Sequence, residues 1–258
     1  MIESEPNFSL DLRGQVALVT GASSGLGWRF AEILAARGAA VALAARRTDR
    51  LDALAQQIEG RGGRAIPVAL DVSGRGSIVA AIDHIEAVLG GVSILINNAG
   101  VPDADHATRL SPEKVDQVLD VNLRGAFILA TEVARRLIAA GRPGRFVNIA
   151  SMAAFDYRGN GAALYSMTKA GLVRMTETLA VEWARFHINV NAIAPGVFAS
   201  EMTDGMLGRM SDEMVRQFPR RRICQPEQLD STLLFLVSPS SECVTGTIIK
   251  VDDGQHGR

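Results

Sequence analysis

The chain has 258 residues, of which 47% are hydrophobic and 21% charged, and its formal net charge is -1. This is the composition of a globular protein, and the near-neutral charge argues against a basic surface for nucleic acid or an anionic membrane. The two cysteines lack metal-site spacing, which indicates a reducing compartment. The acidic start MIESEPNF and the lack of an apolar run of roughly 18 residues predict a cytoplasmic protein without a signal peptide or a membrane span.

The first part of the chain alternates short apolar runs with amphipathic segments. The apolar runs predict strands at residues 16–20, 39–45, 64–72 and 92–100. Helical spacing of apolar residues predicts helices between them, at residues 27–38, 50–63 and 77–91. Pro67 argues mildly against the third strand, because proline cannot donate to a sheet ladder.

The same alternation continues to the end of the chain. A long helix is expected at residues 111–141, opened by Ser111 as cap and Pro112, with Gly125 as a place for a kink. Further strands are expected at 144–151, 188–196 and 246–254, and helices at 165–185 and 226–238. Because strands alternate with helices and are apolar throughout, they predict a parallel sheet covered on both faces. The predicted fold is therefore α/β, a single doubly wound domain over residues 1–258 with about seven strands.

A glycine-rich turn, TGASSGLG, joins the first predicted strand to the first helix. Gly21, Gly25 and Gly27 allow a tight turn and a close approach of the backbone to a ligand. The following helix N-terminus offers N–H groups and a partial positive charge to a pyrophosphate. Alone, such a turn can simply end a strand, but its position in a βαβ unit favours dinucleotide binding.

The end of the second predicted strand bears on the choice of cofactor. An acidic residue at this point binds the ribose 2′-hydroxyl of NAD, whereas an arginine accommodates the 2′-phosphate of NADP. Arg46 and Arg47 follow the strand without a carboxylate, so Arg46 favours NADP(H), and NAD(H) remains possible. A solvated arginine pair is the alternative, and a basic residue in place of Ser24 would have strengthened the case.

Tyr165 and Lys169 lie four residues apart, on one face of the helix expected at 165–185. Two charges about 5 Å apart at an effective dielectric near 20 interact by roughly 3 kcal/mol, or about two pKa units. We therefore expect Lys169 to lower the pKa of the Tyr165 phenol and make it a general acid/base. Ser151 ends a predicted strand, where its hydroxyl can hydrogen-bond a substrate oxygen. Taken singly, each of these residues is more often structural.

Six motifs occur in one order along the chain: TGASSGLG, NNAG at 97–100, Asn122, Ser151, YSMTK and APG at 194–196. The ordered set resembles the short-chain dehydrogenase/reductase family over residues 10–254, similar to 3-oxoacyl-acyl-carrier-protein reductases. The resemblance implies that Asn122, Ser151, Tyr165 and Lys169 are catalytic, with Asn122 holding a water that links Lys169 to solvent. It also implies a nicotinamide cofactor bound by Gly21, Ser23, Ser24, Gly25, Leu26, Gly27, Arg46, Asp71, Val72, Asn98, Ala99, Gly100, Tyr165, Lys169, Pro195, Gly196, Val197 and Ser200. Ser200 stands where the family often has Thr, so it keeps the hydroxyl and loses the methyl group.

The substrate side is expected at a lid over residues 197–223 and at the segment before Tyr165. Met202, Met206, Met210 and Met214 recur every four residues, as a flexible apolar lid or as core packing. The expected substrate contacts are Ser151, Phe155, Tyr157, Tyr165, Met202 and Met206. Arg220–Arg222 are expected to form a solvated patch or subunit contact, or to bind an anionic substrate tail. The scattered histidines predict no metal site.

The sequence therefore predicts an NADP(H)-dependent oxidoreductase that acts on a small-molecule carbonyl or secondary alcohol, with Tyr165 as general acid/base. One alternative is an NAD-dependent catabolic alcohol dehydrogenase. Another is a nucleotide-sensing regulatory protein on the same fold, which the intact set of four catalytic residues disfavours. By the resemblance, we expect a homotetramer, or a homodimer, formed through the long helices.

Overall fold

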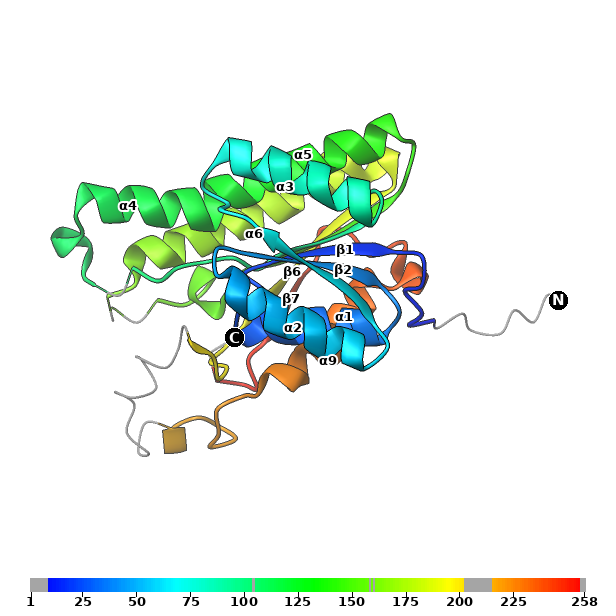
Figure 1. The fold of residues 1–258 in the computed structure, drawn as a ribbon. Helices are drawn as coiled ribbons and strands as arrows, with labels where there is room; N and C mark the ends of the chain where they lie inside the picture. The colour runs from blue at the N-terminus through cyan, green and yellow to red at the C-terminus, as the bar shows by residue number, and fades with distance from the viewer. Residues whose placement is uncertain (1–8, 104, 158, 160, 202–214, 256–258) are drawn as a thin grey trace.

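The computed structural model describes residues 9–103, 105–157, 159, 161–201 and 215–255. Within them, seven parallel strands form one sheet in the order β3-β2-β1-β4-β5-β6-β7 (Figure 1). The strands are β1 (Val16–Thr20), β2 (Ala40–Ala45), β3 (Arg64–Ala69), β4 (Ile94–Asn97), β5 (Gly144–Ile149), β6 (Ile188–Pro195) and β7 (Ile248–Val251). The strand order reverses between β1 and β4, which is where open α/β sheets bind ligands. The predicted doubly wound α/β fold is confirmed.

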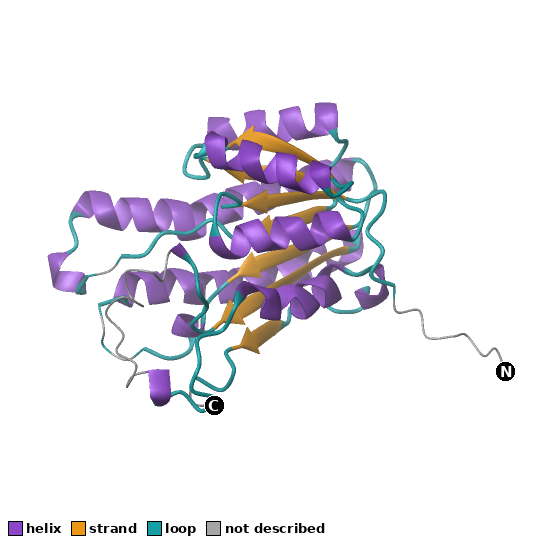
Figure 2. Ribbon diagram, turned by 60° about the horizontal axis from the view of Figure 1, so that its bottom comes forward, coloured by secondary structure: helices purple, strands orange, loops and turns teal. Residues whose placement is uncertain are grey.

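Helices cover both faces of the sheet (Figure 2). They are α1 (Gly25–Ala36), α2 (Thr48–Gly60), α3 (Arg75–Val88), α4 (Pro112–Leu119), α5 (Gly125–Ala139), α6 (Ala163–Trp183) and α9 (Asp230–Val237). One apolar core joins α1, α2 and α9 to residues such as Ala17 and Val19 of β1. A second core joins α3, α5 and α6 to Val16 and Leu18 of the same strand. Alternate side chains of β1 thus enter opposite cores, which is why the strand is apolar throughout.

Pro67 lies within β3, where it pairs in register with Leu43 of β2. The structure places β3 at the edge of the sheet, so only one side of the strand joins a ladder. An edge strand tolerates the missing N–H of proline, which resolves the objection raised by the sequence.

The long helix expected at 111–141 is interrupted. Ser111 caps α4 by accepting a hydrogen bond from the Lys114 N–H, as the sequence predicts. The irregularity is a π-helical turn over Asp120–Arg124 that ends where Gly125 begins α5. The kink expected at Gly125 is therefore a change of helix type just before it, and it contains Asn122. Such π-turns are frequent at functional sites.

Near the C-terminus, the helix expected at 226–238 begins as a 3-10 turn, Pro226–Leu229, and continues as α9. The expected lid begins where Phe198 pairs with Cys224 in an isolated parallel bridge. Met202, Met206, Met210 and Met214 lie outside the described residues. Among the described helices, none is both long enough and apolar enough to cross a bilayer.

Candidate active site

One cavity of about 430 Å³ opens at the carboxyl edge of the sheet, beside the reversal of strand order. Its walls come from the β1–α1 turn, from the ends of β2 to β6 and from α6. Among the predicted site residues it is lined by Gly21, Ser23, Ser24, Gly25, Leu26, Arg46, Asp71, Val72, Asn98, Ala99, Gly100, Ser151, Tyr165, Lys169, Pro195, Gly196 and Ser200. The predicted Gly27, Asn122, Phe155, Tyr157 and Val197 are not among its lining residues. Sequence positions far apart therefore meet around one cavity.

The glycine-rich turn is held tightly against the end of β4. Gly21 has a φ of 65°, a region that side-chain-bearing residues rarely enter. A Cβ on Gly27 would lie 2.3 Å from the Gly21 carbonyl oxygen, so only glycine fits there. The Asn98 side-chain amide donates to the Thr20 carbonyl oxygen at 2.9 Å, which ties the turn to β4.

The turn presents the N-terminus of α1 to the cavity. Ser24 is the N-cap residue but makes no side-chain capping bond, and the first turn holds no acidic residue. A helix N-terminus in this condition attracts anions through its N–H groups and its dipole. The turn therefore fits a pyrophosphate.

The far end of the cavity holds Arg46 and Arg47, as the sequence predicts. Arg47, rather than Arg46, forms hydrogen bonds with the glycine-rich turn. Its guanidinium donates to the hydroxyl oxygens of Ser23 and Ser24, both at 3.0 Å. Arg46 also lines the cavity. Asp71 lies on the neighbouring wall, and hydrogen bonds from Ser73, followed by the charge of Arg46, lower the pKa of its carboxyl. This end suits an adenosine ribose phosphate.

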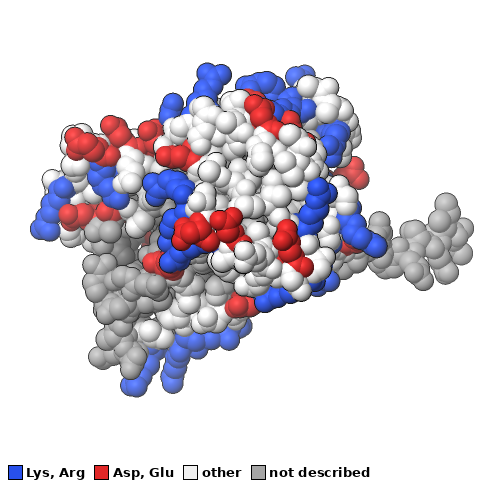
Figure 3. Space-filling view, viewed as in Figure 1, with Lys and Arg blue, Asp and Glu red and all other residues white. Residues whose placement is uncertain are grey.

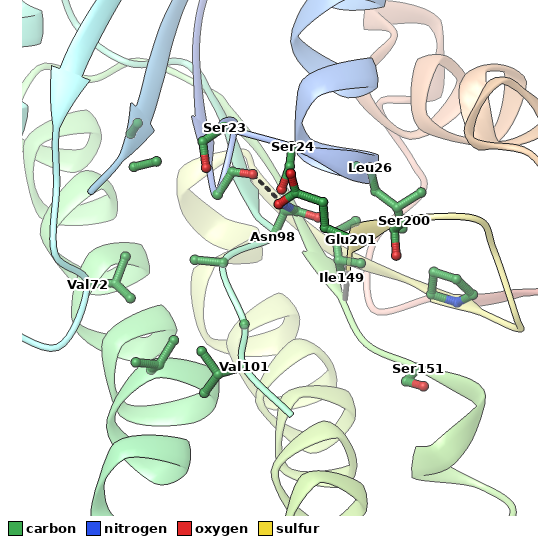
Figure 4. Close-up of a pocket in the computed structure, with 18 of the residues that line it drawn as sticks. Ser23, Ser24, Leu26, Val72, Asn98, Val101, Ile149, Ser151, Ser200 and Glu201 are labelled. Atoms are coloured by element: carbon green, nitrogen blue, oxygen red, sulfur yellow. Dashed lines mark hydrogen bonds between the residues drawn. The ribbon is translucent and has the colours of Figure 1, made fainter. Parts of the chain in front are cut away.

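Tyr165, Lys169 and Ser151 meet in the same cavity (Figure 4 labels Ser151). A side-chain hydrogen bond joins Tyr165 to Ser151. The Lys169 ammonium lies 5.5 Å from the centroid of the Tyr165 ring. It also donates to the Ile149 carbonyl oxygen at 2.7 Å, at the end of β5. The helical spacing read from the sequence thus brings the phenol and the ammonium together.

The expected lowering of the Tyr165 pKa by the protein's own groups is wrong. Burial raises the pKa of the phenol, the hydrogen bond from Ser151 opposes this rise, and the negative charge of Asp103 adds to it. Burial also lowers the pKa of Lys169 to about 8. The cause is desolvation, which acts against the charged form of both groups and cannot be read from their helical spacing.

Asn122 lies in the π-helical turn and is completely buried. Its side-chain oxygen accepts from the Val101 N–H at 2.8 Å, and its amide donates to the Val101 carbonyl oxygen at 2.9 Å. A Cβ on Gly100 would lie 3.5 Å from the Asn122 side-chain oxygen and 3.7 Å from the Lys169 ammonium. Asn122 thus holds the loop after β4 beside Lys169, and its expected role with a water stays a prediction.

Asp103 was missed by the sequence reasoning. Its carboxylate accepts from the Tyr165 N–H at 3.0 Å, in the first turn of α6. The N-cap residue of that helix is Ala162, which makes no side-chain capping bond. A buried residue of the β4 loop therefore supplies the cap of the helix that carries Tyr165. No local pattern in the sequence could have linked positions 62 residues apart.

Gln255 was also missed. Its side-chain oxygen accepts from the Val197 N–H at 2.6 Å, which holds the segment after β6 in place. The expected wall residues Phe155 and Tyr157 are 44% and 46% exposed and do not line the cavity, and Lys250 lies 4.2 Å over the Phe155 ring. Arg220 and Arg222 both pair with Asp253, which gives that patch an intramolecular partner.

Within the described residues, no group of three or more His, Cys, Asp or Glu side chains is placed to hold a metal ion. On the face shown in Figure 3, Lys and Arg side chains are interspersed with Asp and Glu.

Comparison with known proteins agrees with this geometry. A sequence model described as enoyl-(acyl carrier protein) reductase matches residues 21–256. The chain belongs to the short-chain dehydrogenase/reductase family. It is 34% identical to the 3-oxoacyl-(acyl-carrier-protein) reductase FabG of Thermotoga maritima, over 94% of this chain and 98% of that protein.

Two further relatives show the range of functions within the family. An NAD-dependent glycerol dehydrogenase of Listeria innocua is 35% identical, over 95% of this chain and 94% of that protein. The structure of a gluconate 5-dehydrogenase from Burkholderia cenocepacia, in complex with NADP and tartrate, superposes with a TM-score of 0.89 at 33% identity, covering 95% of this chain and 96% of that chain. The chain is thus a dehydrogenase/reductase, and its relatives act on different substrates.

Proposed function

We propose that this enzyme transfers a hydride between NADP(H) and a carbonyl or secondary alcohol, with Tyr165 as general acid/base. The observation that carries the proposal is the meeting of Tyr165, Ser151 and Lys169 in the cavity that also holds the glycine-rich turn. The N-terminus of α1 would bind the pyrophosphate, and Arg46 and Arg47 would bind the 2′-phosphate. When bound, the nicotinamide gives or takes the hydride.

The protein's own groups handle the proton. In the direction of reduction, the Tyr165 hydroxyl donates its proton to the substrate oxygen, and the Ser151 hydroxyl hydrogen-bonds that oxygen. The raised pKa of Tyr165 keeps the phenol protonated and ready to donate. Lys169 stabilises the phenolate that forms, because its ammonium lies 5.5 Å from the ring centroid. The NADP complex of the gluconate 5-dehydrogenase supports the choice of cofactor.

Substitution of Tyr165 by phenylalanine tests the proton role. The purified enzyme would be screened with NADPH and NADH against simple ketones, β-ketoacyl thioesters, sugars and sugar acids. We expect Tyr165→Phe to lower kcat on the accepted substrate by about 10²- to 10⁴-fold. The dissociation constant of NADPH, measured by cofactor fluorescence, should stay unchanged as the internal control. Unchanged turnover would remove Tyr165 from the mechanism, whereas a wild type that binds the cofactor but turns over no substrate would favour a nucleotide-sensing function.

A second candidate is an NAD-dependent alcohol dehydrogenase, which is favoured by the similarity to the glycerol dehydrogenase of Listeria innocua. Tighter binding of NADH than of NADPH by the wild-type protein would select this function. We also propose a cytoplasmic homotetramer, or a homodimer, for which light scattering of the purified protein would give the mass.

A further inference from the structure

An acidic side chain reaches the basic end of the cavity from the opposite wall. The Glu201 carboxylate accepts from the Arg47 guanidinium at 2.9 Å and also forms an ion pair with Arg50. We call these three residues the Glu201 clasp. Arg47 and Arg50 follow β2, whereas Glu201 follows β6, so the ion pairs join segments 154 and 151 residues apart. Neither the cofactor motifs nor the predicted catalytic set includes Glu201.

The clasp lies against the glycine-rich turn. Arg47 donates to Ser24 as well as to Glu201. Ser200, next to Glu201, would lie 3.0 Å from a Cβ on Gly25. Figure 4 shows Ser24, Ser200 and Glu201 together at one end of the cavity and Ser151 at the other. The Glu201 carboxylate therefore lies where the phosphate-binding turn meets the arginines.

A carboxylate and a phosphate compete for the same donors. Both are anions that take the planar N–H groups of a guanidinium in a bidentate way. The Arg47 group that the proposed function assigns to the 2′-phosphate already donates to Glu201. The 2′-phosphate of NADP(H) must therefore displace the Glu201 carboxylate from Arg47. The 2′-hydroxyl of NAD(H) carries no charge and does not compete with Glu201 for this arginine.

We propose that Glu201 is a specificity-determining residue, whose carboxylate occupies the 2′-phosphate position on Arg47 and Arg50 and so limits the preference for NADP(H) over NAD(H). This inference rests on the proposed binding of a nicotinamide cofactor. It goes further, because it assigns an opposing role to a residue outside the cofactor motifs.

The Glu201 carboxylate stays negatively charged near neutral pH. The hydrogen bonds from Arg47 and then from Arg50 lower the pKa of its carboxyl to about 2. Changes of pH near neutrality therefore leave the competition intact, and removing the charge requires a substitution.

The test compares Glu201→Gln with Glu177→Gln. Glu177 is a matched control, because it pairs with Arg174 on α6 and its side chain has the same exposed fraction as Glu201, 41%. Glu177 does not line the cavity. Dissociation constants of NADPH and NADH would be measured by cofactor fluorescence. Adenosine 2′,5′-bisphosphate and adenosine 5′-monophosphate, measured by calorimetry, isolate the phosphate from the nicotinamide.

Exposed ion pairs change equilibria by up to about fivefold each. We therefore expect Glu201→Gln to bind NADPH and the bisphosphate about three- to fivefold more tightly, with NADH and the monophosphate unchanged. Glu177→Gln should match the wild type for all four ligands. In the background Arg47→Gln, the effect of Glu201→Gln should shrink, because the main donor is absent.

An unchanged NADPH affinity in Glu201→Gln would overturn the inference. An equal loss of affinity for NADPH and NADH would also overturn it, since Glu201 would then help to bind the part that the two cofactors share. The proposed cofactor preference fails separately, if the wild type binds NADH more tightly than NADPH. In that case a shift of the Glu201→Gln variant toward NADPH would still support the role of Glu201.

Discussion

Replacing Gly27 by alanine tests whether the glycine-rich turn needs its close packing to bind the cofactor. A Cβ at this position would lie 2.3 Å from the Gly21 carbonyl oxygen and 2.5 Å from the Asn98 amide nitrogen. Both neighbours are held in place, since Asn98 also donates to the Thr20 carbonyl oxygen. The turn or the start of α1 must therefore move by about 1 Å to reach an ordinary contact near 3.4 Å.

The size of the effect follows from this displacement. Overpacking of this kind costs about 1 to 3 kcal/mol of folding free energy, which lowers the Tm of a domain of this size by roughly 2 to 12 °C. A misplacement of about 1 Å at a site that positions a reacting molecule can lower the reaction rate by up to about 100-fold, and we expect the NADPH affinity to fall for the same reason. We expect NADPH to bind at least about tenfold more weakly to Gly27→Ala.

The matched control is Gly76→Ala, in the first turn of α3. A Cβ on Gly76 would meet no heavy atom within 4 Å. Alanine is the better helix former, so this variant should keep the wild-type stability or gain up to about 1 kcal/mol. Calorimetry would give the Tm of both variants, and fluorescence titration the NADPH dissociation constant. Wild-type NADPH affinity in Gly27→Ala would refute the reasoning, as would a Tm change equal to that of Gly76→Ala.

Two further predictions concern the groups around Tyr165. Lys169 has a pKa lowered to about 8, so between pH 8 and its unfolded value near 10.5 the unfolded chain binds more protons and stability rises with pH. Relative to Lys169→Met, the wild type should gain about 2 kcal/mol between pH 7.5 and 9.5 in urea unfolding, and a constant difference would contradict this. Asp103→Asn keeps a cap for the Tyr165 N–H but removes the charge that helps to raise the phenol pKa. The upper limb of its kcat/KM pH profile should therefore move to lower pH, whereas Asp103→Ala should in addition lose about 1 kcal/mol of stability.

The sequence predicted the fold because its signals are local. Apolar strands, helical periodicity and glycine stops each lie within about fifteen residues, and together they specify a parallel sheet covered on both faces. The helical spacing of Tyr165 and Lys169 is local in the same sense. What it could not supply was the sign of the Tyr165 pKa shift, since desolvation depends on everything that packs around the phenol.

The contacts that complete the site come from residues distant in the chain. The sequence by itself determined the doubly wound fold, the glycine-rich turn and the residues that face the cavity from α6. Only the tertiary structure decided that Asp103 caps the helix of Tyr165 and that Glu201 pairs with Arg47. Both are carboxylates with no periodic pattern around them. Their partners depend on which segments meet where the parallel strands end, along one edge of the sheet. That edge exists only once the chain has folded.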